Sequence, residues 1–436
     1  MNFIPNLSRN YIMSDKNEYK PSERIDWGFI ALLGFIAGTF INPVFIFRTG
    51  SIALYRPQLI LGVAALIGLL FGLISRSRTL NWTSIQTSYS IYILTALLSL
   101  LNLASNMDTS SSVDKISTLL KTWLMLVLIG AYAGNSRLFK ICFNFFIFVV
   151  VLVQIHSLKA IIAGVDYTEG RFDIFLGQVS NPDYVGCFFA FMIPVLLEIY
   201  LQREKLLSKM LFLGSALASL FLLVKTQTRG AFLALLVVLV LWVIKKNKRY
   251  ERIKISFITI ICLVIFGTLT AGPGGTFFDR MSTIFIRETR ERDANVVARL
   301  ELWKQGIRIW RKFPVLGAGV GGMDPHEDMD GDYTGGVGLT KRSLHQSFIQ
   351  VLAEQGAVGG LAFLVFLFSI FRSLSRTKKW CKEKGANDIL SIANGLQLGM
   401  IGLLISAFFI SIQDAWVLIF FSGFTVSTYT ISSVRG

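Results

Sequence analysis

Residues 346–371, QSFIQVLAEQGAVGGLAFLVFLFSIF, indicate which kind of fold the chain adopts. Glu354 is the one charged residue in this stretch. A continuous apolar run of this length can cross about 30 Å of hydrocarbon as a helix, whereas a strand of a membrane barrel alternates apolar and polar residues. The stretch therefore predicts a membrane-spanning helix.

The rest of the chain repeats this pattern. Hydrophobic residues make up 53% of the 436 residues and charged residues 16%, and the mean hydropathy is +0.58. These values exclude an ordinary soluble domain. We predict an all-α, polytopic membrane protein with about 12 transmembrane helices. The predicted spans are 27–47, 53–74, 84–104, 115–134, 138–163, 183–201, 206–224, 229–244, 254–271, 346–371, 388–411 and 414–433.

The positions of Lys and Arg orient these spans. If the N-terminus is cytoplasmic, more than half of the 43 basic residues fall in short cytoplasmic segments, while the outer loops 106–114 and 166–173 are neutral or acidic. By the positive-inside rule, both termini are predicted to be cytoplasmic. The net charge of +16 is then a signal of topology, and no nucleic acid is needed to explain it.

This topology divides the chain into four parts. Residues 1–26 are a cytoplasmic segment, 27–271 form transmembrane helices 1–9, 272–345 form a large extracytoplasmic catalytic loop, and 346–436 form helices 10–12.

The large loop is predicted to contain an amphipathic helix. Val296, Leu300, Trp303, Ile307 and Trp310 recur at spacings of four and three, so they form one apolar stripe with arginines beside it. We expect this helix to lie flat in the outer membrane interface, where Trp side chains are favourable.

Several polar residues are predicted on the outer face. Asn181 precedes Pro182 at the start of the sixth span, and this order predicts a helix start that Asn181 or Asp183 caps. Lys225 and Arg229 flank a turn so short that both must lie at the membrane surface. A guanidinium there suits phosphate, and a snorkelling side chain is the alternative.

His345 stands where the large loop meets the tenth span. Gln346, Gln350 and Glu354 follow at intervals of four on one helix face, which must contact protein or water because lipid excludes it. The imidazole of His345 is neutral near pH 7 and is therefore the best candidate for a general base. A structural His at the interface is the alternative.

Two further patterns are rejected as ligand sites. The glycine-rich run 317–322 lacks the strand-then-helix context and the Lys of a nucleotide site. The acidic run 328–332 loosely matches a calcium loop, but position twelve is Leu339. No metal and no cofactor is predicted.

These residues resemble the O-antigen ligase and O-antigen polymerase superfamily of bacterial envelope glycosyltransferases. A large outer loop between the ninth and tenth of twelve spans is also similar to the ligases. Gln346 departs from the pattern, since many relatives have Asn there, and 324–332 has no counterpart. The matching motifs are Ser180-Asn181-Pro182-Asp183, Thr228-Arg229-Gly230, Arg299-Leu300-x-x-Trp303, Pro314-x-x-Gly317-x-Gly319, and His345 followed by Glu354, Gly356 and Gly359.

The resemblance implies transfer of a glycan from undecaprenyl diphosphate to an acceptor hydroxyl on the periplasmic side of the bacterial inner membrane. The acceptor is lipid A–core in the ligases, another lipid-linked repeat unit in the polymerases, and a protein side chain in a third branch. The expected partners are therefore the undecaprenyl-diphosphate-linked glycan, the glycan acceptor and membrane lipids.

The chemistry of the residues fits a metal-independent, inverting transfer. His345 is expected to deprotonate the acceptor, while Arg229 and Arg299 stabilise the departing diphosphate. Further diphosphate ligands are expected to be Lys225, Arg171 and Arg287, with Asn181, Trp303 and Glu354 in supporting positions.

Two alternatives stay open. A polymerase of O-antigen or exopolysaccharide uses the same chemistry, and the ligase is preferred for its long loop after the ninth span and for the spacing from Arg299 to His345. A twelve-span transporter is an alternative of another class, but transporter sites lie near the bilayer midplane, and the candidate polar residues gather on one face.

Overall fold

The computed structural model describes residues 25–41, 57–103, 109–164, 167–168, 171–172, 181–244, 249–269, 294–321, 344–413 and 415–434. Nearly all of them are helical, so the predicted all-α class is confirmed. The strands among the described residues form a single two-residue antiparallel hairpin, β1 (Tyr167–Thr168) with β2 (Arg171–Phe172). The helices are α1 (Trp27–Phe40), α3 (Pro57–Ile74), α4 (Ser84–Ser99), η2 (Leu100–Asn102), α5 (Thr109–Tyr132), α6 (Ser136–Ile162), α7 (Pro182–Gln202), α8 (Leu206–Thr226), α9 (Arg229–Ile244), α10 (Arg249–Leu269), α12 (Ala294–Lys312), α13 (Ser347–Lys384), α14 (Asn387–Ser406) and α15 (Trp416–Val434).

Each predicted span overlaps one of these helices, although several bounds differ, since α13 runs on to Lys384 and α5 begins at Thr109. Seven of them are long and apolar enough to cross a membrane, namely α4 with η2, α6, α7, α8, α13, α14 and α15. The chain is therefore a polytopic all-α membrane protein. Twelve as the number of crossings stays a prediction, because α1, α3 and α9 are shorter.

The predicted eleventh span, 388–411, was too long at its C-terminal end. α14 ends at Ser406, and residues 407–413 form a connection outside the helix. The backbone of this connection bonds to Ser347 instead, since the amide of Ser347 donates to Ala407 O at 2.9 Å. Apolar composition alone could not separate the helix from this connection.

α7 lies at the centre of the bundle, and 89% of an apolar 18-residue stretch of this helix is buried. It packs against α8, α9 and α14. Gly395 and Gly399 of α14 face it, and a Cβ at Gly395 would lie 2.7 Å from Val195 Cα. This pair of glycines four residues apart lets the two helices approach closely, as is common between membrane helices.

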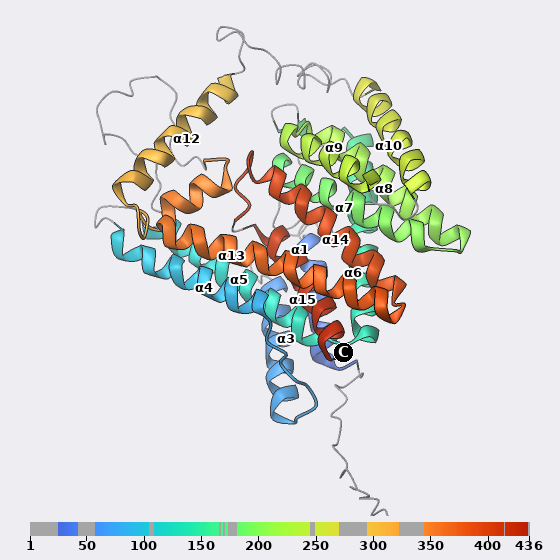
Figure 1. Cartoon of the computed structure of the whole chain (residues 1–436), viewed down its shortest axis with the longest axis horizontal. Helices are drawn as coiled ribbons and strands as arrows, with labels where there is room; N and C mark the ends of the chain where they lie inside the picture. Colours follow the sequence, from blue (N-terminus) through green and yellow to red (C-terminus); the bar gives the residue numbers. More distant parts are fainter. Residues whose placement is uncertain are drawn as a thin grey trace, which may run out of the picture.

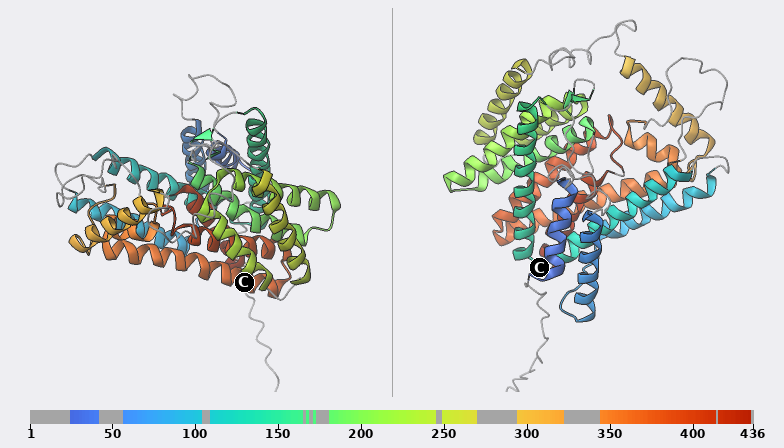
Figure 2. Two further views of the ribbon diagram at one scale, coloured as in Figure 1. Left: turned by 90° about the horizontal axis from the view of Figure 1, so that it is seen from above. Right: turned by 180° about the vertical axis from the view of Figure 1, so that it is seen from behind.

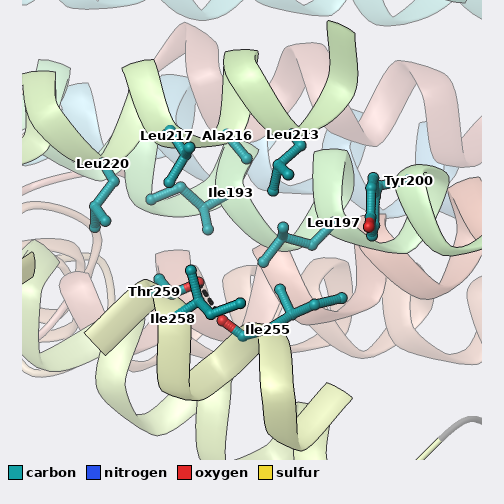
Figure 3. A pocket seen from close by; sticks show the side chains of 10 residues that line it. All are labelled: Ile193, Leu197, Tyr200, Leu213, Ala216, Leu217, Leu220, Ile255, Ile258 and Thr259. Atoms are coloured by element: carbon teal, nitrogen blue, oxygen red, sulfur yellow. Dashed lines mark hydrogen bonds between the residues drawn. The ribbon is translucent and has the colours of Figure 1, made fainter. Parts of the chain in front are cut away.

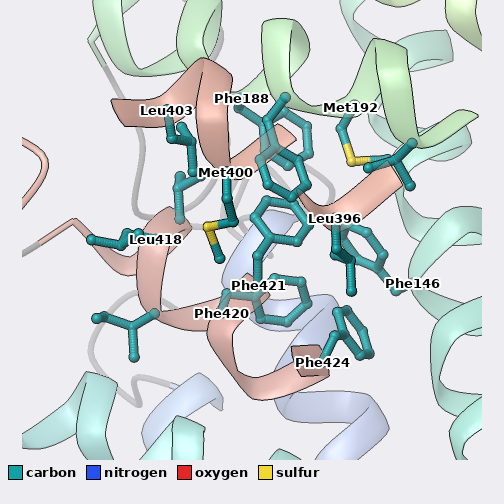
Figure 4. Close-up of a cluster of buried hydrophobic side chains, with 14 of the residues drawn as sticks. Phe146, Phe188, Met192, Leu396, Met400, Leu403, Leu418, Phe420, Phe421 and Phe424 are labelled. Atoms are coloured by element: carbon teal, nitrogen blue, oxygen red, sulfur yellow. The ribbon is translucent and has the colours of Figure 1, made fainter. Parts of the chain in front are cut away.

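Phenylalanine side chains from three helices fill the space beside α7 (Figure 4). The rings of Phe191 in α7 and Phe421 in α15 stack with their centroids 3.7 Å apart. Phe146 of α6 packs against Phe421 and Phe424. These contacts fix the relative positions of α6, α7 and α15 by dispersion and by aromatic geometry.

The amphipathic helix α12 lies along one flank of the bundle, against α13, while α8, α9 and α10 form the opposite flank (Figures 1 and 2). Its contact with α13 uses Leu302, Gly306 and Ile309, which pack against Leu344 and Ile349. Two members of the predicted apolar stripe, Leu300 and Ile307, are exposed. That face is thus left open, as a helix in the membrane interface requires; the interfacial position itself stays a prediction.

α13 is interrupted at Gly356, where φ is 65° and ψ is −165°. We call residues 347–355 the half-helix. The backbone groups released by the break bond to the segment after α12: Ala318 N donates to Ala353 O at 2.9 Å, and Ala357 N donates to Pro314 O at 2.9 Å. The glycine-rich segment therefore completes the hydrogen bonding of a broken helix.

An apolar cavity of about 80 Å³ lies between α7, α8 and α10 (Figure 3). Ile193, Leu197, Leu213 and Ile255 are among the residues that line it. It holds no charged side chain and is far too small for a glycan, so it is a packing defect and no candidate for the site.

Candidate active site

Four helices begin at the same end of the bundle. The start of α9 bonds to the start of α7, because Thr228 Oγ1 donates to Pro182 O at 3.1 Å. The starts of α13 and α15 lie on either side of the connection 407–413, to which Tyr184 of α7 also bonds through a 2.6 Å hydrogen bond to Ser411 O. We call this the site end. The basic residues that follow α7 and those in the last turn of α13 fall at the opposite end.

Asn181 forms the predicted N-cap of α7. Its side-chain oxygen accepts from the amide of Asp183 at 2.8 Å, and Pro182 occupies the first helical turn. The carboxylate of Asp183 is buried, with the residue 7% exposed. It is therefore held at the positive end of the α7 dipole, which favours its ionised form.

Asp183 joins two motifs that are distant in the sequence. Thr228 donates to its Oδ1 at 3.3 Å, and Arg299 Nη2 lies 3.5 Å from its Oδ2. Arg229 follows Thr228 as the first residue of α9. The structure thus brings Asn181, the Thr228–Arg229 turn and Arg299 of α12 together, although 118 positions separate the first of them from the last.

The connection 407–413 is the common neighbour of these residues. Arg299 Nη1 donates to Phe409 O at 3.4 Å. A Cβ at Gly230 would lie 2.7 Å from Phe409 Cβ, so the glycine leaves room for this side chain.

His345 precedes the half-helix and is partly exposed. Its φ of 51° lies in the left-handed region, which non-glycine residues seldom adopt. Two neighbours hold it there: Trp303 Nε1 donates to Leu344 O at 3.1 Å, and Gln346 caps the half-helix through the amide of Ile349. Trp303 thus bonds to the backbone next to His345, and its supporting role stays a prediction.

Ser347 attaches the half-helix to the connection 407–413. Its hydroxyl donates to Ile410 O at 2.8 Å and accepts from the amide of Ile412 at 2.8 Å. Arg299, Gly230 beside Arg229, and Ser347 two residues after His345 therefore all contact the same short connection.

Glu354 ends the polar stripe that the sequence predicted to avoid lipid. Gln346, Gln350 and Glu354 are all buried, the last only 3% exposed, so that prediction is confirmed. Glu354 Oε1 accepts from Gln350 Nε2 at 3.0 Å and forms an ion pair with Lys115 of α5. Ser411 in turn donates to Gln350 Oε1.

For three predicted cations, the described residues show no contact with this group. Lys225 ends α8, and its ammonium lies 5.8 Å from the ring centroid of Phe221 on the same helix. Arg171 lies in β2 opposite Thr168, and Arg287 falls outside the described residues. A role for these three in binding stays a prediction.

The sequence reasoning missed three parts of the site. Asp183 was considered only as a cap, Lys115 was placed at the start of a span without a role, and residues 407–413 were assigned largely to a helix. The polar pair Ser411 and Gln413 between two apolar runs was the available signal for the last of these.

In the part of the chain that the structure describes, no three His, Cys, Asp or Glu side chains group as metal ligands. The arrangement instead presents guanidinium groups and one imidazole at a common end. Such groups can bind a diphosphate and accept a proton.

Comparisons with known proteins agree with this arrangement. A family model described as "O-Antigen ligase" matches residues 214–364, which include Arg229, Arg299, His345 and Glu354. The chain is also 25% identical over 241 residues to a ComP-specific O-oligosaccharyltransferase of Acinetobacter baylyi, a match that covers 52% of this chain and 42% of that protein. The aligned part therefore spans less than half of the relative. Together with the motifs assembled at the site end, these matches make the chain similar to the O-antigen ligase superfamily.

Proposed function

We propose that the protein is a glycosyltransferase that moves a glycan from undecaprenyl diphosphate to an acceptor hydroxyl at the outer face of the bacterial inner membrane. The observation that supports it most is that Arg299 and the segments that carry Arg229 and His345 all contact the single connection 407–413. In this proposal the site end is periplasmic and both termini are cytoplasmic.

Arg299 suits a role in binding the leaving group. Its side chain is 33% exposed, and its partners Asp183 and Phe409 are 3.4–3.5 Å away, distances at which hydrogen bonds are weak. A diphosphate oxygen can therefore replace either contact with a shorter, charge-assisted bond. Arg229 at the start of α9 adds a second guanidinium and the positive end of a helix dipole.

His345 acts as the general base in this proposal. The acceptor hydroxyl gives its proton to the imidazole while its oxygen forms a bond to the anomeric carbon of the glycan. The bond from that carbon to the diphosphate oxygen breaks, and the diphosphate leaves with the electron pair against Arg229 and Arg299. A single displacement of this kind inverts the anomeric configuration, and it requires no metal ion.

The acceptor we favour is lipid A–core, as in an O-antigen ligase. A protein hydroxyl is a second candidate, because the relative from A. baylyi is named for a specific protein. A polymerase, with another lipid-linked glycan as acceptor, shares the same chemistry.

A transporter is the competing class. The break at Gly356 and the buried pair of Glu198 with Arg252 are features that transporters also show. The break, however, lies nine residues from the start of α13, near its outer end, and the buried pair lies at the opposite end of the bundle. Neither forms a site at the midplane.

The test uses variants that preserve the local structure. His345→Asn is preferred to His345→Ala, since Asn tolerates the left-handed backbone at this position. We expect the purified variant to lose a factor of about 10²–10⁴ in transfer rate, and Arg299→Ala to lose about 10²–10³. The matched controls are His156→Asn and Arg308→Ala, whose side chains are exposed on α6 and α12.

The measurement is transfer from purified undecaprenyl-diphosphate oligosaccharide, together with a gel of envelope glycolipids from a strain that lacks the gene. Full-length polymer on undecaprenyl diphosphate beside bare lipid A–core supports the ligase. Single repeat units on the normal acceptor point to the polymerase, and loss of glycosylated protein points to the protein acceptor. Near-normal transfer by folded His345→Asn contradicts the mechanism.

A further inference from the structure

The half-helix 347–355 is too short to hold its own position. It contains nine residues, and the non-helical Gly356 separates it from the long remainder of α13. The rigidity of α13 is therefore not transmitted across the break. What holds the half-helix, and with it His345, must be the contacts that it makes with neighbouring segments, through its backbone and its side chains.

Glu354 makes the strongest of these contacts at the C-terminal end of the half-helix. A carboxylate that is buried at the negative end of a helix dipole is unfavourable unless it is paired. Glu354 at this position therefore needs a cation beside it.

Lys115 of α5 supplies that cation. Its ammonium contacts Glu354 Oε1, and the lysine side chain is 25% exposed while that of Glu354 is 3% exposed. α5 itself packs against α3, α4 and α15, so it is fixed independently of α13. The ion pair thus joins the half-helix to the main body of the bundle.

The charge on Glu354 also determines how Gln350 is oriented. An ionised carboxylate only accepts hydrogen bonds, so it requires the NH₂ group of the Gln350 amide. That leaves Gln350 Oε1 for the hydroxyl of Ser411, whose carbonyl accepts from Tyr184. The pair therefore orders a chain of hydrogen bonds that ends at α7, beside Asp183.

The glycine-rich segment that covers the break is held by η2, which follows α4, and by the start of α5. Asn102 Nδ2 donates to Gly317 O at 2.9 Å. A Cβ at Gly321 would lie 2.8 Å from the backbone of Ser112. The half-helix is thus held from two sides by elements outside the matched region 214–364.

We propose that Lys115 is a positioning residue: by neutralising buried Glu354, it fixes the half-helix and places His345 against the connection 407–413. This inference rests on the proposed role of His345 as the base. Lys115 does not touch the substrate; it acts through Glu354.

The test compares Lys115→Met, Lys115→Arg, Glu354→Gln and the double variant Lys115→Met/Glu354→Gln in purified protein. Lys115→Met leaves a buried carboxylate without its cation, and we expect kcat to fall about 10- to 100-fold by misplacement of His345, with the KM for undecaprenyl-diphosphate oligosaccharide unchanged. The double variant removes both charges, so it should return to within about threefold of wild type. Lys115→Arg should keep most of the activity.

Lys121→Met is the matched control, because Lys121 is exposed on the same helix; its activity should stay within about twofold of wild type. The second readout is hydrogen exchange, which does not depend on turnover. In Lys115→Met, amides of 347–355 should exchange faster while those of 357–384 stay as in wild type.

Wild-type kcat and unchanged exchange in Lys115→Met would overturn the inference, as would a double variant no better than Lys115→Met. Faster exchange of 347–355 in a protein whose wild type transfers no glycan would keep the positioning role and contradict the proposed function instead. The two failures are therefore distinguishable.

Discussion

Asp183 shows what a single residue contributes to this site. The sequence identified it as part of a helix start, and that is correct, since Asn181 caps the amide of Asp183. Its second role depends on Thr228 and Arg299, which approach it from α9 and α12. No local pattern around position 183 contains this information, because it arises from three helices meeting.

The first prediction concerns this carboxylate. Asp183→Asn keeps the shape and the contact with Thr228 but removes the charge beside Arg299. The pair is partly exposed and separated by 3.5 Å, so its loss should lower kcat/KM for the donor at most about fivefold. Asp183→Ala removes both contacts and should cost more.

Steady-state kinetics at several donor concentrations measure this effect. An Asp183→Asn variant as inactive as Arg299→Ala would mean that the carboxylate takes part in the chemistry and does not merely orient Arg299.

At the scale of elements, the break in α13 is the feature that shapes the site. It requires a residue that adopts φ 65° with ψ −165° and a neighbouring segment that accepts the released backbone groups. Gly356 and the segment Pro314–Gly319 meet these needs together. The spacing of these glycines in the sequence therefore reflects one packing contact between two segments.

The second prediction tests this contact. A Cβ at Gly356 would lie 2.2 Å from Val315 O, and the backbone conformation alone costs a non-glycine residue about 1–3 kcal/mol. Gly356→Ala should therefore lower the thermal stability of the purified protein and its transfer rate together.

Gly214→Ala is the control, because nothing lies within 4 Å of a Cβ there and α8 is regular at that position. It should be neutral or stabilising by up to about 1 kcal/mol. A Gly356→Ala protein that melts like Gly214→Ala would contradict the assigned packing.

Across the whole molecule, the two ends of the bundle have different tasks. The site end gathers polar residues that are partly exposed, whereas the opposite end contains a closed polar cluster. Glu198 of α7 is fully buried and accepts from Arg252 Nη2 at 3.0 Å and from Trp242 Nε1 at 2.8 Å. This cluster fastens α7, α9 and α10 to each other.

The third prediction separates these tasks. Glu198→Ala leaves the guanidinium of Arg252 buried without its carboxylate, and we expect a loss of about 3–5 kcal/mol in stability. Turnover per folded molecule should stay close to wild type, since the cluster lies at the end remote from His345. Thermal unfolding and active-fraction kinetics measure the two quantities separately.

Lys140→Ala is the matched control. Its ion pair with Asp388 is exposed on both sides, and such pairs contribute about 0–1 kcal/mol. If both variants lost the same stability, burial of the Glu198 pair would not explain its contribution.

The sequence alone determined the helical class, the position of each long apolar helix, the cap at Asn181 and the burial of the stripe from Gln346 to Glu354. These properties follow from composition and periodicity within one segment, because an apolar run must become helical in hydrocarbon and a polar stripe must avoid lipid.

Only the tertiary structure decided the face by which α12 packs, the end of α14 at Ser406, and the contacts of Asp183, Lys115 and residues 407–413. Each of these depends on groups that lie far apart in the chain and come together only when the helices pack. A sequence pattern within one segment carries no information about such contacts. The arrangement of the site is therefore a property of the assembled bundle.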